Sequence, residues 1–179
     1  MSELRMSELP RVGVSSCLLG HLVRYDGVQK GLRWVSEALS SLVELVPICP
    51  EVGSGMPVPR PPIQLVQRAS GIREMELVRG DEDVHSAMRA FCDAMQEKLA
   101  THRLHGYLFK ARSPSCGIVD TPHFSESGTI VGRGPGMWAE TIIAHWPELP
   151  IADESSVQDE AGQREFLRRV RAYQQRDLL

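Results

Sequence analysis

Three of the four cysteines in this 179-residue sequence follow short apolar runs and precede turns. Cys17 ends the segment 11–17, Cys49 ends the segment 45–49, and Cys116 follows the run 106–111 within a turn of Ser, Pro and Gly. The carboxyl ends of parallel strands open onto one crevice of an α/β sheet, so we expect these thiols to lie together. Thiolates are soft ligands, and three of them in one crevice could bind a metal.

Several kinds of site are compatible with this set of thiols. A zinc site calls for a fourth ligand and usually for close CxxC pairs, which the sequence lacks. A disulfide would leave one thiol unpaired. A catalytic thiol would need a base such as His21 or His123, which the spacing does not support. An iron–sulfur cubane held by three thiolates would use all three and leave one iron open for chemistry. Cys92 differs, because it lies beside the apolar face of an expected helix and is interpreted as a core residue.

The composition is typical of a soluble globular protein, with 24% charged and 42% hydrophobic residues. The net charge of −3 gives no general attraction to anionic membranes, and a stable nucleic-acid complex is not expected. No apolar run is long enough to span a bilayer, and residues 1–10 lack the apolar core of a signal peptide. We therefore expect a cytoplasmic protein with reduced thiols, consisting of a flexible tail over 1–10 and one domain over 11–179.

The hydrophobic periodicity predicts strands that alternate with helices. Strands are expected at 11–17, 45–49 and 106–111, with an edge strand at 149–152 and a small hairpin formed by 63–67 and 74–79. Helices are expected over 30–44, from 81 or 83 onward, from Gly136 to His145, and from 156 onward. The segment 118–130 is expected to be irregular, the alternative being a short hairpin at Ser127-Gly128. This order predicts an α/β fold: a single Rossmann-like domain with a mostly parallel sheet, helices on both faces, and ligands at the carboxyl ends of the strands.

The segment 50–62 has an unusual composition, with five prolines and two glycines. Prolines lack the backbone donor that helices and central strands require, so we expect neither element here. A stiff loop in a compact chain usually shapes a site, the alternative being a rigid connector.

Five motifs, taken together, resemble the DUF523 family. They run in the expected order from about residue 12 to beyond 130: Ser16-Cys17-Leu18-Leu19-Gly20, Arg24-Tyr25-Asp26-Gly27, Cys49-Pro50-Glu51-Val52, Pro57-Val58-Pro59-Arg60-Pro61-Pro62 and Lys110-Ala111-Arg112-Ser113-Pro114-Ser115-Cys116-Gly117. That family includes the thiouracil desulfidases, which act on thiolated pyrimidines. The chain departs from the family pattern at 53–57 and 118–124, and we expect it to be without the second domain of the larger relatives.

The resemblance implies a [4Fe-4S] cluster on Cys17, Cys49 and Cys116, with the fourth iron open for a substrate sulfur. It also implies non-redox desulfuration of 2-thiouracil, 4-thiouridine or its nucleotides such as thio-UMP, giving the oxo-pyrimidine and sulfide. A thiocarbonyl sulfur is a soft donor that suits the open iron, and polarising the C=S bond prepares its carbon for attack by water.

Two further residues are expected to be catalytic. Glu51 lies two residues after Cys49, and the resemblance points to it as the acid or base that handles the proton of the attacking water. The alternative is that Glu51 only caps backbone N–H groups. Ser113 matches a family position near the substrate. Ser115 could take this role instead, or bond only its own turn.

Four charged residues are candidates for substrate binding. Lys110 and Arg112, at a strand end, could hold a nucleotide phosphate or be surface charges. Arg60, in the proline-rich loop, has the same two interpretations. Asp26 could contact a ribose or cap the first loop.

Overall fold

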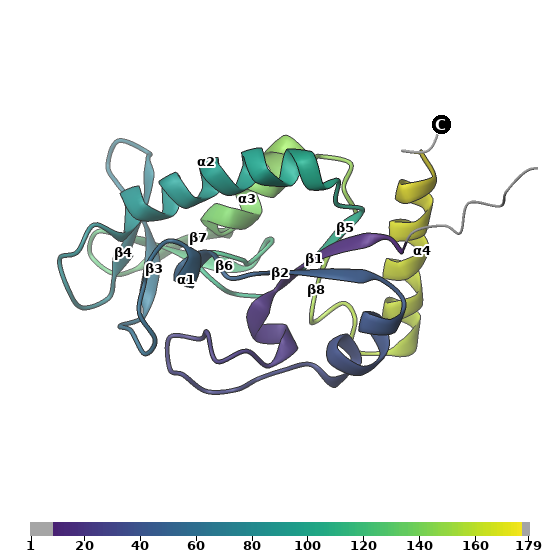
Figure 1. The fold of residues 1–179 in the computed structure, drawn as a ribbon. Helices are drawn as coiled ribbons and strands as arrows, with labels where there is room; N and C mark the ends of the chain where they lie inside the picture. Colours follow the sequence, from purple (N-terminus) through teal and green to yellow (C-terminus); the bar gives the residue numbers. More distant parts are fainter. Residues whose placement is uncertain (1–8, 177–179) are drawn as a thin grey trace, which may run out of the picture.

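The computed structural model describes residues 9–176, in which two four-stranded sheets are connected by helices (Figure 1). Sheet A has the order β2-β1-β5-β8, and each neighbouring pair is parallel. Its strands are β1 (Arg11–Ser15), β2 (Glu44–Ile48), β5 (Gly106–Phe109) and β8 (Ile151–Asp153). The mostly parallel sheet of the expected α/β fold is therefore confirmed.

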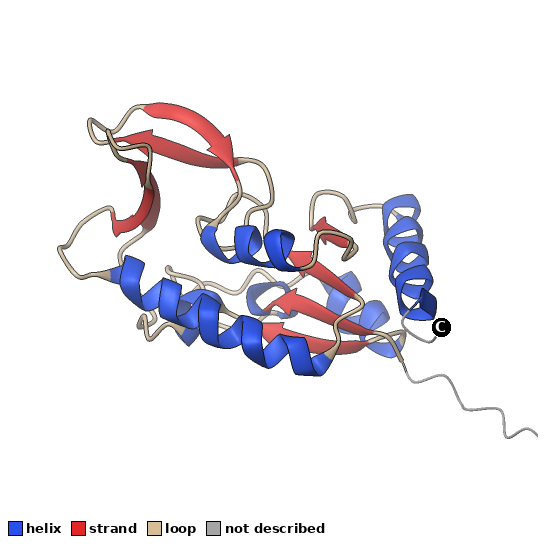
Figure 2. Cartoon of the chain, turned by 90° about the horizontal axis from the view of Figure 1, so that it is seen from above, coloured by secondary structure: helices blue, strands red, loops and turns tan. Residues whose placement is uncertain are grey.

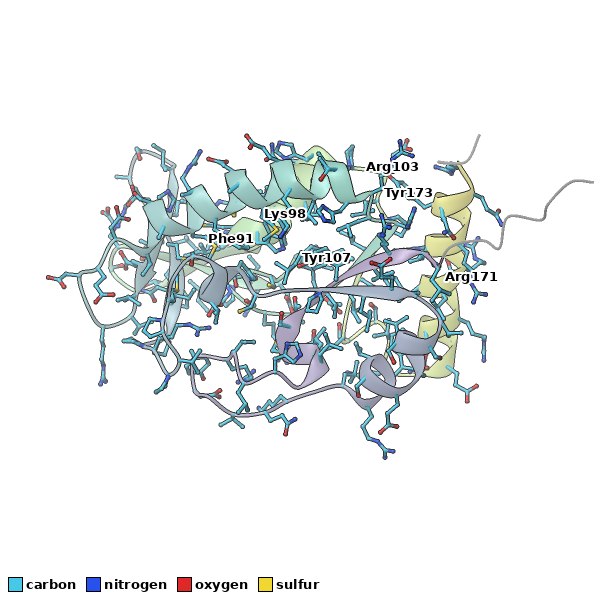
Figure 3. All side chains as sticks on the ribbon, in the orientation of Figure 1. Phe91, Lys98, Arg103, Tyr107, Arg171 and Tyr173 are labelled. Atoms are coloured by element: carbon cyan, nitrogen blue, oxygen red, sulfur yellow. The ribbon has the colours of Figure 1, made fainter. Side chains whose placement is uncertain are left out.

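The two central strands of sheet A, β1 and β5, are almost wholly buried because both faces of the sheet are covered. Every residue of β5 is buried, as are the last four of β1. Gly13 lies opposite Tyr107, and a Cβ atom on Gly13 would come within 2.4 Å of the Tyr107 ring. The absence of a side chain at Gly13 lets this large ring occupy the layer between sheet A and α2 (Figure 3).

Helices cover both faces of sheet A, as expected. One core joins the sheet to α2 (Val84–His102) and α3 (Met137–His145), and the other joins it to α4 (Glu160–Arg176) and the short turns η2 (Trp34–Ala38) and η3 (Leu39–Ser41). Cys92 is 4% exposed within the first core, which confirms its interpretation as a core residue. Within residues 9–176, no helix is long and apolar enough to cross a membrane.

Sheet B, with the order β4-β3-β6-β7, lies beyond the carboxyl ends of β1 and β2 (Figure 2). The expected hairpin forms its strands β3 (Ile63–Gln67) and β4 (Arg73–Leu77). The segment 118–130 is not irregular, because β6 (Thr121–Ser125) pairs parallel to β3 and β7 (Ile130–Gly134) pairs antiparallel to β6. The alternative, a hairpin that turns at Ser127-Gly128, is confirmed by the β6–β7 pair. The partner strand of β6 comes from more than fifty residues earlier, so local sequence did not reveal it.

The expected helix over 30–44 is wrong in length and type. Only two short segments form, the π-helical η2 followed by the 3₁₀-helical η3. Three serines in this stretch donate their hydroxyls to carbonyls three or four residues back, Ser36 to Arg33, Ser40 to Ser36 and Ser41 to Ala38. Serine hydroxyls that bond the backbone in this way compete with regular helix formation.

The exclusion of helix from 50–62 is also wrong, since α1 spans Pro50–Gly53. Proline is tolerated at the first helical position, where its missing N–H would have had no partner in the helix. At the chain ends, α4 begins at Glu160 and not at 156. Most of the expected tail, residues 1–8, lies outside the described residues, whereas Pro10 is buried and its carbonyl accepts a hydrogen bond from the Glu44 amide at 2.9 Å.

Candidate functional site

The carboxyl ends of the sheet A strands surround a cavity of about 530 Å³. Cys17 lies in the short turn η1 (Ser16–Leu19) after β1, Cys49 follows β2, and Cys116 lies in the turn after β5. All three line the cavity. The fold therefore brings together the three cysteines that the sequence analysis selected from their positions at strand ends. Cys92 is not among the lining residues.

The three thiols share a partly desolvated environment. Burial raises the pKa of Cys17 to about 11, an effect that the Lys110 ammonium partly offsets. Burial also raises the pKa of Cys49, and it raises that of Cys116, which is 4% exposed, well above the usual range. Electrostatic interaction with the other two thiols adds to the raised pKa of Cys116. The thiols are close enough to influence one another and sit where a positive centre would stabilise their thiolate forms.

The cysteines at the cavity are the residues that could hold a metal centre. In the described part of the chain, no group of three or more His, Cys, Asp or Glu side chains is arranged to hold one metal ion. Thiolates that hold a cubane bind different irons, so they need only surround a common cavity. All four cysteines are free, and Cys17, Cys49 and Cys116 line the common cavity.

Glu51 lies on α1 at the cavity wall and is held by two residues. The Arg60 guanidinium pairs with its Oε2 through both Nε and Nη2, and the Ser115 hydroxyl donates to its Oε1 at 2.8 Å. The side chains of Arg60 and Glu51 are only 3% and 12% exposed. Arg60 also donates to the carbonyls of Pro57, at 3.1 Å, and Val23, at 2.9 Å. Arg60 thus connects the proline-rich loop, the loop after η1 and the candidate acid/base residue.

The turn that carries Cys116 is fixed by its own serines. The Ser113 Oγ accepts hydrogen bonds from the amides of Ser115, at 3.3 Å, and Cys116, at 3.1 Å. It also lies 3.0 Å from the Ser115 Oγ, so Ser113, Ser115 and Glu51 form a continuous hydrogen-bonded row. Both serines line the cavity, but Ser115 is only 1% exposed. Ser113 is therefore the more accessible of the two hydroxyls.

The start of α3 holds the same turn from the opposite side. The first amides of a helix have no partner within it, and here they donate to carbonyls of the cysteine turn. These bonds run from Gly136 to Gly117, from Met137 to Pro114, and from Trp138 and Ala139 to Ser115. A Cβ atom on Gly136 would lie 2.6 Å from the Ser115 backbone, so this close approach requires glycine. The turn is thus built into the core and does not depend on solvent-exposed contacts.

Lys110 and Arg112 have different environments. The Lys110 ammonium pairs with Glu154 and donates to the Ala111 carbonyl at 3.1 Å. Arg112 is exposed at the cavity, has a φ of 58°, and forms no side-chain ion pair with the described residues. Glu154, which the sequence analysis missed, also accepts a hydrogen bond from the Ala111 amide at 2.5 Å. Its only sequence signal is a carboxylate directly after a short apolar strand.

Asp26 does not line the cavity. Its carboxylate accepts two hydrogen bonds from Arg24 and one from the Val28 amide, and these bonds lower its pKa to about 2. The neighbouring Arg24 and Tyr25 do line the cavity. His21 and His123, the alternative bases for a catalytic thiol, are not among the lining residues either.

The model of the 2-thiouracil desulfurase family matches residues 12–154. The chain belongs to this family. The match spans every residue of the sequence-predicted site, from Cys17 to Cys116, and confirms the resemblance stated from the motifs. No curated protein matches the chain.

The fold of this chain is similar to the solved structure of a [4Fe-4S]-dependent thiouracil desulfidase, TudS. The identity is 27% and the TM-score is 0.65, and the match covers 85% of this chain and 95% of the other. The name DUF523 is part of the description of that structure, in agreement with the family that the motifs indicated.

Proposed function

We propose that this chain is a [4Fe-4S]-dependent desulfidase that removes sulfur from a thiolated pyrimidine. The observation that carries the proposal is the meeting of Cys17, Cys49, Cys116 and Glu51 at one cavity of a 2-thiouracil desulfurase family member. The similarity to a thiouracil desulfidase that depends on the same cluster supports the choice of cofactor.

The three cysteines would hold the cluster, each through one sulfur. When bound, the cluster would supply an open, Lewis-acidic iron for the thiocarbonyl sulfur of the substrate. The cavity is formed largely by side chains that are themselves held in place, so the bound base would meet a preorganised wall.

Glu51 is the proposed general base. It takes a proton from water as the water oxygen attacks the C=S carbon, and the C–S bond breaks while a C=O bond forms. The balance is one thiocarbonyl and one water giving one carbonyl and one hydrogen sulfide, with no change of oxidation state. Arg60 and Ser115 orient the carboxylate from two sides, one oxygen each. Ser113, the more accessible hydroxyl of the row, contacts the substrate or the attacking water.

The proposed substrates are 2-thiouracil, 4-thiouridine and thio-UMP. Arg112 is the better candidate for a phosphate contact, because Glu154 already neutralises Lys110. Arg60 pairs with Glu51, and Asp26 pairs with Arg24, so each holds a cavity-lining residue in position. The four free cysteines agree with a reducing, cytoplasmic setting.

The test is anaerobic reconstitution followed by turnover. We expect about four iron and four sulfide per chain, a broad cubane absorption band, and release of oxo-pyrimidine with one sulfide per product. A panel of thio-base, thio-nucleoside and thio-nucleotide ranks the substrates. A fully loaded protein that converts none of them would be a cluster-bearing binding protein instead, and a colourless zinc protein would remove the cluster from the proposal.

A further inference from the structure

An aromatic side chain, that of Tyr25, lies in the wall of the cavity. No other aromatic residue of the described chain lines the cavity, whose wall otherwise consists of thiols, hydroxyls, charged groups, prolines and aliphatic side chains. Tyr25 is 43% exposed, in contrast to the fully buried rings of Tyr107 and Trp138 in the core. Core packing therefore does not account for the Tyr25 ring, and its surface is available to a ligand in the cavity.

The Tyr25 ring is held in place although it is exposed. The guanidinium of Arg24 lies over the ring, 5.7 Å from its centroid, which is a cation–π distance. Arg24 is itself fixed by Asp26, whose carboxylate accepts two hydrogen bonds from it at 3.1 and 2.9 Å. The backbone is fixed as well, because the Arg60 amide donates to the Tyr25 carbonyl at 2.9 Å. Three residues of the Arg24-Tyr25-Asp26-Gly27 motif thus act together to present one ring.

Arg60 connects this ring to the candidate base. Its side chain pairs with the Glu51 carboxylate, with Nε at 2.9 Å from Oε2, while its amide holds the Tyr25 carbonyl. The groups assigned so far address the edge of a pyrimidine, since the open iron takes its sulfur and Glu51 and Ser113 serve the water that attacks the C=S carbon. They leave the flat faces of the ring without a contact. Aromatic side chains stack on such faces and tolerate differences between bases, because every base has a π-face.

We propose that Tyr25 is a substrate-binding residue that stacks on the flat face of the thiolated pyrimidine and so sets the plane of the bound ring. The inference rests on the proposed function, which supplies the ligand. A stack requires a planar ring but makes no use of the sulfur, so Tyr25 holds the oxo-pyrimidine product as well as the substrate. An interaction of equal strength in the substrate and in the transition state lowers KM and leaves kcat unchanged. Tyr25 therefore contributes to affinity and to selection of planar rings, and not to the chemical step.

The experiment compares Tyr25→Ala, Tyr25→Phe and Leu22→Ala in the anaerobically reconstituted full chain. Leu22→Ala is the matched control, because Leu22 is a 62% exposed apolar residue of the same loop that does not line the cavity. The readouts are the dissociation constant of uracil, which is not turned over, by equilibrium dialysis, and kcat and KM for 2-thiouracil. In Tyr25→Ala we expect both the dissociation constant and KM to rise about 5- to 100-fold, the range for loss of one base–aromatic stack, with kcat within about twofold. Tyr25→Phe and Leu22→Ala should match the wild type.

Unchanged uracil affinity in Tyr25→Ala, an equal loss in Tyr25→Phe or Leu22→Ala, or a wild type that binds no uracil overturns the inference. If Tyr25→Ala loads less iron than the wild type, Tyr25→Leu, which keeps an apolar side chain without a ring, takes its place. Loss of iron in both variants shows a structural role and also overturns the inference. A wild type that binds uracil through Tyr25 but releases sulfide from no thiolated pyrimidine overturns the proposed function and leaves the stack standing, which distinguishes the two failures.

Discussion

The carboxyl end of sheet A and the outer surface of sheet B both contain arginine–glutamate pairs, but in opposite environments. At the cavity, Arg60 and Glu51 have side chains 3% and 12% exposed, and Arg60 also bonds two carbonyls. On sheet B, the Arg68 side chain is 33% exposed and pairs with three glutamates that are at least as accessible to water, Glu74, Glu76 and Glu126.

The difference in burial between these ion pairs indicates different roles for the two regions. A buried pair costs desolvation free energy, and it is kept where a charge must be held in one position. Exposed pairs are screened by water and salt and contribute little to stability. The cavity end of sheet A therefore holds charges and thiols at fixed positions, whereas the charges of sheet B keep its hairpins hydrated. The following changes test that contrast, from the largest expected effect to the smallest.

Replacing a cavity cysteine should have the largest effect. Cys17→Ser, Cys49→Ser or Cys116→Ser should each lose the cluster and bring desulfuration below detection, because a hydroxyl is a poor ligand for iron in place of a thiolate. Cys92→Ala, the matched change on the buried face of α2, should keep iron content and turnover. Iron and sulfide analysis with product measurement checks both. Cluster loss in Cys92→Ala, with retention in all three cavity variants, would contradict the assignment.

Glu51→Gln should come next. The amide keeps the shape of the side chain but cannot take a proton from water, so turnover should fall by about 10²–10⁴-fold while the cluster loads normally. The measurement is kcat alongside iron content and the visible spectrum. Glu74→Gln on sheet B is the matched control, since it neutralises an exposed partner of an arginine and should leave the rate unchanged. A wild-type rate in Glu51→Gln would remove this residue from the mechanism.

The sequence predicted those parts of the site that depend on strand ends. Cys17 and Cys116 follow strands that are almost wholly buried, and Cys49 follows a short apolar run that is partly exposed. Short apolar runs of this kind are recognisable in the sequence without knowing their partners. Glu51 was found because it lies two residues from Cys49.

Hydrogen-bond and ion-pair partners that only the tertiary fold brings together could not be predicted from the sequence. Arg60 was expected to be either a substrate contact or a surface charge, and its pairing with Glu51, nine residues away in the chain, was not predicted. Glu154 reaches Lys110 from 44 residues away, and Ser15 reaches the Lys110 amide from 95. The pairing of β6 in sheet B was not predicted for the same reason, since its parallel partner β3 is distant in the sequence. Hydrogen-bond partners across such separations follow from packing and leave no periodic signal in the sequence.

Arg60→Met should destabilise the cluster-free protein strongly. The change leaves the Glu51 carboxylate buried without its counter-ion, which typically costs about 3–5 kcal/mol in the free energy of unfolding. Urea unfolding monitored by circular dichroism measures the loss. The double variant Arg60→Met/Glu51→Leu should recover part of it, because no unpaired charge then remains. A loss below about 1 kcal/mol would mean that this pair behaves like an ordinary surface pair.

Arg68→Gln on sheet B should have the smallest effect on the free energy of unfolding. It tests the exposed ion pairs in the same comparison. Its three glutamate partners remain hydrated when the charge is removed, so no buried group is left unpaired. We expect a urea unfolding curve that overlays the wild type at physiological salt, with any difference confined to low salt, where screening is weaker. Arg60→Met, in contrast, should keep most of its destabilisation at high salt, since the Glu51 side chain is only 12% exposed and salt screens it weakly. A large, salt-independent loss in Arg68→Gln would show that sheet B also uses its charges to hold structure, and the contrast between the two sheets would not stand.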